Sequence, residues 1–413
     1  MREERDYIIV GAGLAGLHTG IRLKKKYPKA TVTILERFGY TGGRVVTYNH
    51  DVPGYGKVQW ENGAGRIHRQ NHPLVMKYLR RYGLTFSPIG DELEFKDGAQ
   101  QRLSIFEKTY LPMIESILSA ASDLEKRKHT IKDLLTQIVG PKKTAELVAE
   151  FPYDSEIDTL RADWALEVFR GEMSSSSGFG VCKEGLSVLI DNMVQEFESL
   201  GGEILEKHRV SNIDVNERVI EVLKGPSFVA SKAIILALHI SALRELPFLR
   251  GSGIALLDRV AMRPLLRTYG VFEGTPFKGL NKIVEADGIR YFIPMGPSVA
   301  MVSYTDGPYA EKWMRVLEKE GEDVLCKKIM AGLRKLLWND NIPEPLFFKA
   351  HPWKAGCSYW VPGDYDVRAA SVQAHTPFPG KPIFICGESF SLRQAWMEGA
   401  LEHADSLFEN VVL

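Results

Sequence analysis

The start of the chain divides into apolar runs separated by one glycine-rich turn. Residues Tyr7–Val10 form a short apolar run, which predicts a buried strand. Apolar residues at helical spacing then predict a helix over Leu14–Lys26, and the run TVTIL predicts a second strand over Thr31–Leu35. The pattern therefore predicts a strand, a tight turn, a helix and a second strand in succession.

The rest of the chain mixes helical and strand patterns. Residues 100–150 are amphipathic with helical spacing, and residues 186–215 predict a helix, a glycine stop and a pair of strands. The apolar run 232–238 predicts another buried strand. From Leu265 onward alternating positions predict strands, and two helical stretches follow between residues 311 and 337. The last segment, PIFICGESFSLRQAWMEGALEHADSLF, again predicts a buried strand, a glycine and a long helix.

Similar elements thus occur at both ends of the chain and again near residues 185–240. A chain of 413 residues exceeds the length at which one hydrophobic core usually stops growing, so two domains are expected. No Pro-rich linker separates two halves, and the short SSSSGFG stretch at 174–180 predicts only a loop. The pattern therefore predicts two interleaved domains rather than two consecutive ones.

The composition narrows the class of protein. Apolar residues make up 45% of the chain and charged residues 25%, as in ordinary globular proteins. Lys+Arg and Asp+Glu both total 52, and this balance disfavours nucleic acid as a partner. The four cysteines are widely spaced, which indicates reduced thiols rather than a disulfide framework. With a charged start and no long apolar run, we expect a cytoplasmic protein without a signal peptide or membrane anchor. The oligomeric state stays open.

The glycine cluster GAGLAG lies in the predicted strand–turn–helix unit. Gly11 would permit the tight turn, Gly13 would let the backbone approach a pyrophosphate, and Gly16 would allow close packing of helix on strand. Glu36 ends the second strand, where an acid can accept hydrogen bonds from ribose hydroxyls. The alternative is a plain glycine turn with a surface glutamate. The surrounding pattern favours a nucleotide site.

The stretch ERFGYTGGR at 36–44 narrows the choice of nucleotide. A second glycine pair lets the backbone approach a cofactor, and Arg44 offers paired donors to a diphosphate. Here the sequence resembles the flavin amine oxidase family, which includes monoamine, polyamine and L-amino-acid oxidases. The resemblance continues in WENGAGRI at 60–67, in HRV at 208–210 and in ICGES and WMEGA between residues 385 and 400.

The resemblance implies FAD as the cofactor, and it implies an α/β fold. A Rossmann-type FAD-binding domain would consist of residues 1–85, 185–240 and 350–413, with a mixed α+β substrate domain inserted as 86–184 and 241–349. The residues that the resemblance places against the cofactor are Gly11, Gly13, Ala15, Gly16, Glu36, Arg37, Gly43, Arg44, Gly63, Ala64, Gly65, Arg66, Val210, Gly387, Glu388, Trp396, Met397 and Ala400.

The resemblance also implies a reaction on a small-molecule substrate. An amine or amino acid would be oxidised to the imine by hydride transfer to flavin N5, and oxygen would then reoxidise the flavin and yield hydrogen peroxide. Two alternatives stay open. One is an FAD-dependent desaturase or isomerase acting on a carbon–carbon bond of a lipid-like substrate. The other is an FAD-binding protein without turnover.

Aromatic residues and one arginine are candidates for the substrate wall. Trp396 falls where amine oxidases place an aromatic residue against the substrate, although a core tryptophan would fit the same position. Tyr359 and Trp360 would either complete that wall or pack in the core. Arg66 aligns with an arginine that clamps the carboxylate of an amino acid, but it could equally bind the cofactor or form an internal ion pair.

Three further positions depart from simple expectations. Arg267 stands where the family usually has a lysine, and an arginine is permanently charged, so it would anchor water or attract an anionic group. Fast reaction with oxygen is therefore an open question. Cys357 lies near the position of covalent FAD attachment in some relatives, but we expect non-covalent FAD. His68 and His72 have the spacing of a helical metal pair without a third ligand, so we expect no metal.

Overall fold

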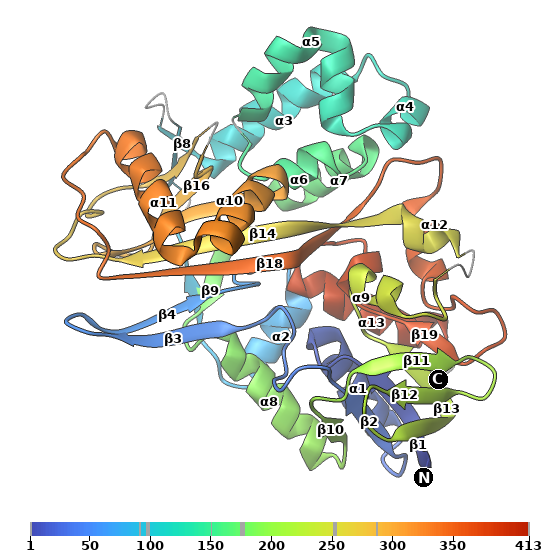
Figure 1. Cartoon of the computed structure of the whole chain (residues 1–413). Helices are drawn as coiled ribbons and strands as arrows, with labels where there is room; N and C mark the ends of the chain where they lie inside the picture. The colour runs from blue at the N-terminus through green and yellow to red at the C-terminus, as the bar shows by residue number, and fades with distance from the viewer. Residues whose placement is uncertain are drawn as a thin grey trace.

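Two large sheets organise the chain in a computed structural model (Figure 1). The structure describes residues 2–90, 92–95, 100–149, 151–173, 178–250, 254–285 and 288–411. Residues 174–177, the serines of the predicted loop, lie outside the described residues.

The first sheet holds the strand–turn–helix unit of the N-terminus. Its strand order is β10 (Glu203–Leu205), β2 (Val32–Leu35), β1 (Arg2–Val10), β13 (Ser227–Leu236), β12 (Val219–Val222) and β11 (Val210–Asp214), and β19 (Ile383–Ile385) pairs with the end of β13. β10, β2, β1, β13 and β19 run parallel, whereas β12 and β11 are antiparallel. The sheet thus brings together strands from three distant parts of the chain.

Helices pack against this sheet through their apolar sides. α1 (Leu14–Lys26) has the predicted bounds, and it packs against α8 (Leu186–Ser199) and α13 (Met397–Asn410). Leu17 and Ile21 of α1 are almost fully buried, because the helical spacing puts them on the side that faces the sheet. The basic residues at the end of α1 suit the negative end of the helix dipole.

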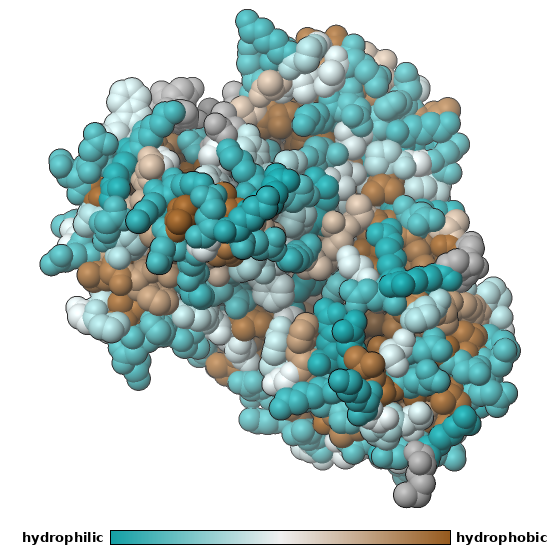
Figure 2. Space-filling model, in the orientation of Figure 1, coloured by the Kyte–Doolittle hydropathy of each residue, from teal (hydrophilic) through white to brown (hydrophobic). Residues whose placement is uncertain are grey.

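The second sheet contains two long neighbouring strands, β14 (Val260–Val271) and β18 (Phe347–Trp360). Its order continues with β17 (Val299–Asp306), β16 (Tyr291–Pro294), β15 (Lys282–Val284), β7 (Glu92–Phe95) and β8 (Gln100–Arg102). α10 (Gly307–Glu320) and α11 (Glu322–Leu337) pack on it, and Figure 2 shows that their outward side is mainly hydrophilic. The expected domain boundary at residue 350 falls inside β18, so this strand belongs to the second sheet as far as Trp360.

A group of helices covers the end of β14 and β18. It consists of α3 (Leu103–Leu118), α4 (Asp123–Lys128), α5 (Ile131–Ala149), α6 (Asp154–Asp158) and α7 (Ala162–Met173). These helices confirm the helical prediction for residues 103–149. Their apolar side chains share one core with Trp360 of β18 and with Ile8 and Val10 of β1. Of the helices in the described part of the chain, none is both long and apolar enough to span a bilayer.

Shorter elements connect these parts. They are β3 (Thr47–Val52), β4 (Gly56–Glu61), β5 (Ile67–His68), α2 (Pro73–Arg81), β6 (Phe86–Pro88), β9 (Phe179–Cys182), α9 (Ile240–Glu245), α12 (Val367–Gln373) and the 3₁₀ turns η2 (Ala255–Arg259) and η3 (Glu388–Phe390). β3 and β4 form a hairpin, and β5, β9 and β6 form a small third sheet.

Candidate active site

A cavity of about 640 Å³ is lined by residues of both large sheets. One side is formed by the glycine turn after β1, the ends of β2 and β13, and the start of α13. The other side is formed by β14, β17 and β18. Nearly all residues that the sequence assigns to a cofactor line this cavity, although they are spread from Gly11 to Ala400.

The glycine turn has the geometry that the sequence predicts. Gly11 has a φ of +104°, and a Cβ there would lie 2.7 Å from the carbonyl oxygen of Ala237. A Cβ on Gly16 would collide with the carbonyl oxygen of Gly11, so Gly16 permits close helix–strand packing and does not itself line the cavity. Gly13 has open space around its Cα and lines the cavity, as does Ala15.

This turn fits a diphosphate. The first amides of any helix lack intrahelical acceptors, and Gly13, the N-cap residue of α1, offers no side chain to cap them. Gly43 has a φ of +61° and Gly387 a φ of +123°, and both line the cavity close to this turn. A hypothetical Cβ on Gly43 would lie 3.5 Å from the Cα of Gly13. Three chain segments therefore present bare backbone to one space.

Glu36 is fixed by the backbone around it. Its Oε2 accepts a hydrogen bond from the amide of Ala12 at 2.9 Å, and its Oε1 accepts one from the amide of Phe38 at 2.9 Å. A carboxylate has about four acceptor sites, so both oxygens keep capacity for ribose hydroxyls. The residue that the sequence assigns to the ribose thus fits that role.

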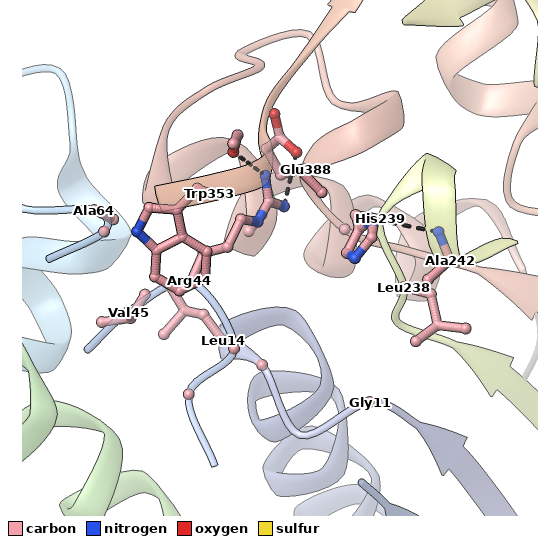
Figure 3. Close-up of a pocket in the computed structure, with 18 of the residues that line it drawn as sticks. Gly11, Leu14, Arg44, Val45, Ala64, Leu238, His239, Ala242, Trp353 and Glu388 are labelled. Carbon is pink, nitrogen blue, oxygen red and sulfur yellow. Dashed lines mark hydrogen bonds and ion pairs between the residues drawn. The ribbon is translucent and has the colours of Figure 1, made fainter. Parts of the chain in front are cut away.

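Arg44 and Glu388 form an ion pair across the cavity wall (Figure 3). Arg44 donates from Nη2 to Glu388 Oε2 at 2.9 Å and from Nη1 to the carbonyl oxygen of Gly356 at 2.8 Å. A guanidinium has five donors, so the remaining ones can reach an anionic ligand. Glu388 also accepts hydrogen bonds from Ser358 and from the amide of Ala395. It therefore acts mainly by holding Arg44.

The segment GAGR follows β4 and lies against Arg44. A Cβ on Gly63 would collide with the carbonyl oxygen of Arg44, and that oxygen accepts the amide of Ala64 at 2.9 Å. A Cβ on Gly65 would lie 3.5 Å from Nη1 of Arg267. Glycine is needed at Gly63 because of the Arg44 backbone, and at Gly65 because a Cβ would lie 3.0 Å from the Cβ of Glu61.

Polar and aromatic residues surround the end of the cavity near β2 and β11. Val210 lines it from β11, as expected, and Arg37 lines it while facing Glu245 of α9 at 3.7 Å. Phe38 and Tyr40 stack with ring centres 5.3 Å apart and are each more than two-fifths exposed. The resemblance places Val210 and Arg37 against the cofactor, and both line this end of the cavity.

His239 is a cavity residue that the sequence prediction missed. Its Nδ1 accepts the amide of Ala242 at 3.2 Å (Figure 3), and burial, with the charges of Arg44 and Arg37, lowers the pKa of His239 to about 3. The ring is therefore neutral and carries its proton on Nε2, which makes that nitrogen a hydrogen-bond donor. Its position after the buried strand 232–238 was the available signal, since ligands bind at the carboxyl ends of parallel strands.

Trp396 lies in an aromatic wall at the other end of the cavity. Its ring centre is 4.8 Å from that of His72 and 5.8 Å from that of Phe179. Arg66 packs its guanidinium Cζ 5.5 Å from the Trp396 ring centre, 5.4 Å from Phe179 and 5.2 Å from Tyr153. Both Arg66 and Trp396 line the cavity, as do Met397 and Ala400 at the start of α13.

Of the two residues expected to complete this wall, Tyr359 and Trp360, only Tyr359 lines the cavity. Burial raises the pKa of the Tyr359 phenol well above the ordinary value. Trp360 is fully buried on the other side of β18, where its Nε1 donates to the carbonyl oxygen of Ser391 at 3.0 Å. Neighbouring residues of a strand point to opposite faces, so only one of the two can reach the cavity.

Cys357 lines the cavity as a protonated thiol, and the two histidines belong to different elements. Burial raises the pKa of the Cys357 thiol to about 12, which keeps it in the less reactive protonated form. His68 belongs to β5, whereas His72 is the N-cap residue of α2, so the two do not share a helix. Within the described residues, no three acidic, histidine or cysteine side chains gather as metal ligands would.

Tyr153, Glu156 and Tyr304 also line the cavity and were not predicted. Tyr153 precedes α6, Glu156 lies on it, and Tyr304 lies on β17 opposite Arg267. The rings of Tyr153 and Tyr304 meet edge to face, with centres 5.7 Å apart. Their sequence surroundings carry no motif, because packing between separate elements brings them to the cavity.

Comparison with known proteins identifies the family. The sequence model described as flavin containing amine oxidoreductase matches residues 14–406. The chain belongs to this family. It is therefore an FAD-dependent enzyme that oxidises amines, which confirms the predicted cofactor and class of reaction.

Two relatives and one solved structure illustrate the similarity. The putative L-amino-acid oxidase YobN of Bacillus subtilis (strain 168) is 23% identical over 96% of this chain and 92% of its own. The L-amino-acid oxidase of Naja atra is 35% identical, but over only 22% of this chain and 17% of its own. Wild-type putrescine oxidase bound to putrescine has a TM-score of 0.73 with 14% identity over 99% of both chains. This likeness confirms the α/β fold that the sequence predicts for this chain.

Proposed function

We propose that this enzyme oxidises a free amino acid at the carbon that bears the amino group. The observation that carries the proposal is the Arg66 guanidinium, which lines the cavity with three aromatic rings within 5.5 Å of its Cζ. Stacking of this kind fixes the plane of the guanidinium, and a fixed plane suits the paired hydrogen bonds of a carboxylate. The relatives named L-amino-acid oxidases support this choice of substrate.

The residues around Arg66 have distinct tasks in this proposal. FAD, when bound, accepts the hydride from the substrate and passes its electrons to oxygen. Arg66 binds the substrate carboxylate, and Trp396 gives the adjacent carbon an apolar surface. Tyr153, Tyr304 and Tyr359 reduce the space for water around the reacting carbon, because each places a ring in the cavity wall.

The other candidate reactions have less support. A carbon–carbon desaturase of lipids would be expected to have a long apolar tunnel, whereas this end of the cavity presents Arg66, Arg267 and Glu156. Oxidation of a plain amine would make no use of the Arg66 guanidinium as a carboxylate site. Cytoplasmic location and non-covalent FAD stay predictions within this proposal.

Anaerobic mixing with substrates tests the proposal. An amino acid and the amine that lacks only its carboxylate are compared by the bleaching of flavin absorbance, with peroxide release measured in air. We expect the amino acid to reduce the flavin at least about 10²-fold faster at low concentration, because a paired charged contact is lost in the amine. Faster bleaching by the amine would contradict the proposal.

Substitution of Arg66 provides the matched test. Arg66→Met should lower kcat/KM for the amino acid about 10²-fold while leaving the slow reaction of the amine nearly unchanged. Arg66→Lys keeps a charge but loses the fork, so an intermediate loss is expected. Equal losses for the amino acid and the amine would show that Arg66 supports the fold or the cofactor instead.

A further inference from the structure

Arg267 is a second arginine of the substrate wall, and it lies on the second sheet. Its side chain projects from β14 on the same face as Leu265, two residues earlier, and both line the cavity. Nη1 of Arg267 donates to the carbonyl oxygen of Glu61 at 3.3 Å, and Cζ lies 5.4 Å from the ring centre of Tyr304. The guanidinium is thus fixed in place at the cavity surface.

The charge of Arg267 lacks a counterion within the described part of the chain. No described carboxylate forms an ion pair with it, and its buried Nε has no hydrogen-bond partner there. The acid that acts on it electrostatically, Glu61, is itself bound by the hydroxyl of Thr47 and the amide of Leu186. Burial raises the pKa of Glu61 to about 7, so this acid is partly protonated at neutral pH.

Other cations along the cavity are paired. Arg44 binds Glu388 at 2.9 Å, Lys354 binds Glu318 at 2.7 Å, and Arg37 faces Glu245 at 3.7 Å. A half-buried guanidinium without a counterion is matched best by a ligand that supplies the negative charge. The cofactor's diphosphate is not that ligand, because the bare glycine backbone that fits it belongs to the first sheet. We therefore assign the anion at Arg267 to the substrate.

Arg66 and Arg267 flank one pair of tyrosines. Arg66 lies 5.2 Å from the Tyr153 ring centre, Tyr153 and Tyr304 have centres 5.7 Å apart, and Arg267 lies 5.4 Å from Tyr304. Glu156 lines the same part of the cavity. Arg66 and Arg267 therefore lie on the two sides of one part of the cavity wall.

We propose that the substrate is an acidic amino acid, with Arg66 at its α-carboxylate and Arg267 at the carboxylate of its side chain. The proposal rests on the proposed function, because Arg66 must bind the first carboxylate. Aspartate and glutamate represent the chemical class, and their amides are isosteric ligands without the second charge. Arg267 therefore determines specificity and does not take part in the transfer of hydride.

The test compares acids with amides on the FAD-loaded enzyme. Anaerobic bleaching rates and kcat/KM are measured for L-aspartate, L-glutamate, L-asparagine, L-glutamine and L-leucine. We expect at least one acid to exceed its amide about 10²-fold in kcat/KM, mainly through KM. Equal rates for the acid and the amide, or a preference for L-leucine, would overturn the inference and leave amino-acid oxidation intact. Bleaching by amines alone would instead contradict the proposed function.

Variants of Arg267 test whether the preference for acids over amides depends on this residue. Arg267→Met should reduce the preference for acid over amide to within a few-fold, and Arg267→Gln provides a second neutral variant if the first fails to fold. Lys354→Met is the matched control, because it removes a cation that lines the cavity but is mostly exposed and paired with Glu318. The flavin spectrum and FAD content are recorded for each variant. A changed spectrum with equal losses on all substrates would assign Arg267 to the cofactor and overturn the inference.

Discussion

Glu388 is the single residue that connects most of the cavity wall. Its two carboxylate oxygens accept hydrogen bonds from Arg44, from the amide and hydroxyl of Ser358, and from the amide of Ala395. These donors come from β18 and from the two ends of the chain. A buried carboxylate with four donors is well satisfied, but the loss of its charge would leave Arg44 without a counterion.

Glu388→Gln should destabilise the apoprotein by about 3 kcal/mol. The amide nitrogen of glutamine would face donors that need an acceptor, and Arg44 would be left unpaired. Denaturant unfolding followed by tryptophan fluorescence measures the change. Glu402→Gln is the control, because the one ion pair of Glu402 with a described residue is that with Arg393, at 3.3 Å, on the more exposed side of α13. A loss no larger than that of the control would contradict the structural role of Glu388.

At the scale of elements, Glu398 joins α13 to α2. Its carboxylate, fully buried, accepts the amides of Leu74 and Val75 at the start of α2. The positive end of the helix dipole favours the charged form, but burial outweighs it and raises the pKa of Glu398 to about 7. Native protein thus binds a proton here at a pH where the unfolded chain has released it.

The pH dependence follows from that difference. For Glu398, the folded pKa of about 7 exceeds the ordinary value of 4.5, so this residue makes stability fall as pH rises through that interval. The slope should approach about 1.4 kcal/mol per pH unit for one proton. Glu398→Gln should flatten the profile of unfolding free energy between about pH 5 and 7, which is roughly the window set by the two pKa values. The exposed Glu409→Gln should leave the profile unchanged. An unchanged slope in Glu398→Gln would contradict this assignment.

The start of helix α6 is likewise fixed by a buried carboxylate, that of Asp306. Asp306, at the end of β17, accepts the amides of Asp154 at 3.0 Å and Ser155 at 3.2 Å. This helix carries Glu156 and follows Tyr153, both of which line the cavity. The position of one substrate wall therefore depends on a residue outside the cavity.

Asp306→Ala should raise KM for the substrate about 10-fold with a smaller change in kcat, because α6 loses two acceptors that fix its start. Asp306→Asn keeps one acceptor and should have a milder effect. Steady-state kinetics on both variants measures this split. A loss confined to kcat, with KM unchanged, would show that α6 does not position the substrate.

The sequence predicted the helices, strands and turns better than it predicted the residues that line the cavity. The bounds of α1 and the roles of Gly11 and Gly16 followed from local pattern, because turn geometry and helix spacing are properties of neighbouring residues. Tyr153 and Tyr304 could not be predicted in this way, since their positions depend on the packing of α6 against β17. The boundary at residue 350 was placed inside β18 for a related reason. Pairing with β14, rather than any break in the pattern, determines where that strand belongs.

At the scale of the whole molecule, the cofactor site joins segments that are far apart in sequence. Gly13 at one end and Gly387 at the other present bare backbone to the same cavity. Ligand binding should therefore stabilise the entire fold rather than one local region.

Addition of FAD to the apoprotein should raise the thermal midpoint progressively with concentration. At about 100 times Kd, the expected stabilisation is about 2.7 kcal/mol. Thermal scans of apoprotein with increasing FAD measure it, and Gly13→Val serves as a comparison, because its side chain would occupy the open space at Gly13. No shift with FAD in the unsubstituted protein would contradict the assignment of this cavity to the cofactor.

Strand β18 limits how this cavity can change over evolution. Cys357 and Tyr359 face the cavity, whereas Ser358 between them does not line it and donates its hydroxyl to Glu388. Inserting or deleting one residue here would exchange the two faces, moving Tyr359 away from the ligand and Ser358 away from Glu388. New substrates can therefore be acquired at β18 by substitution only. Changes of length are expected instead in connecting loops, such as the tip of the β3–β4 hairpin, whose side chains do not line the cavity.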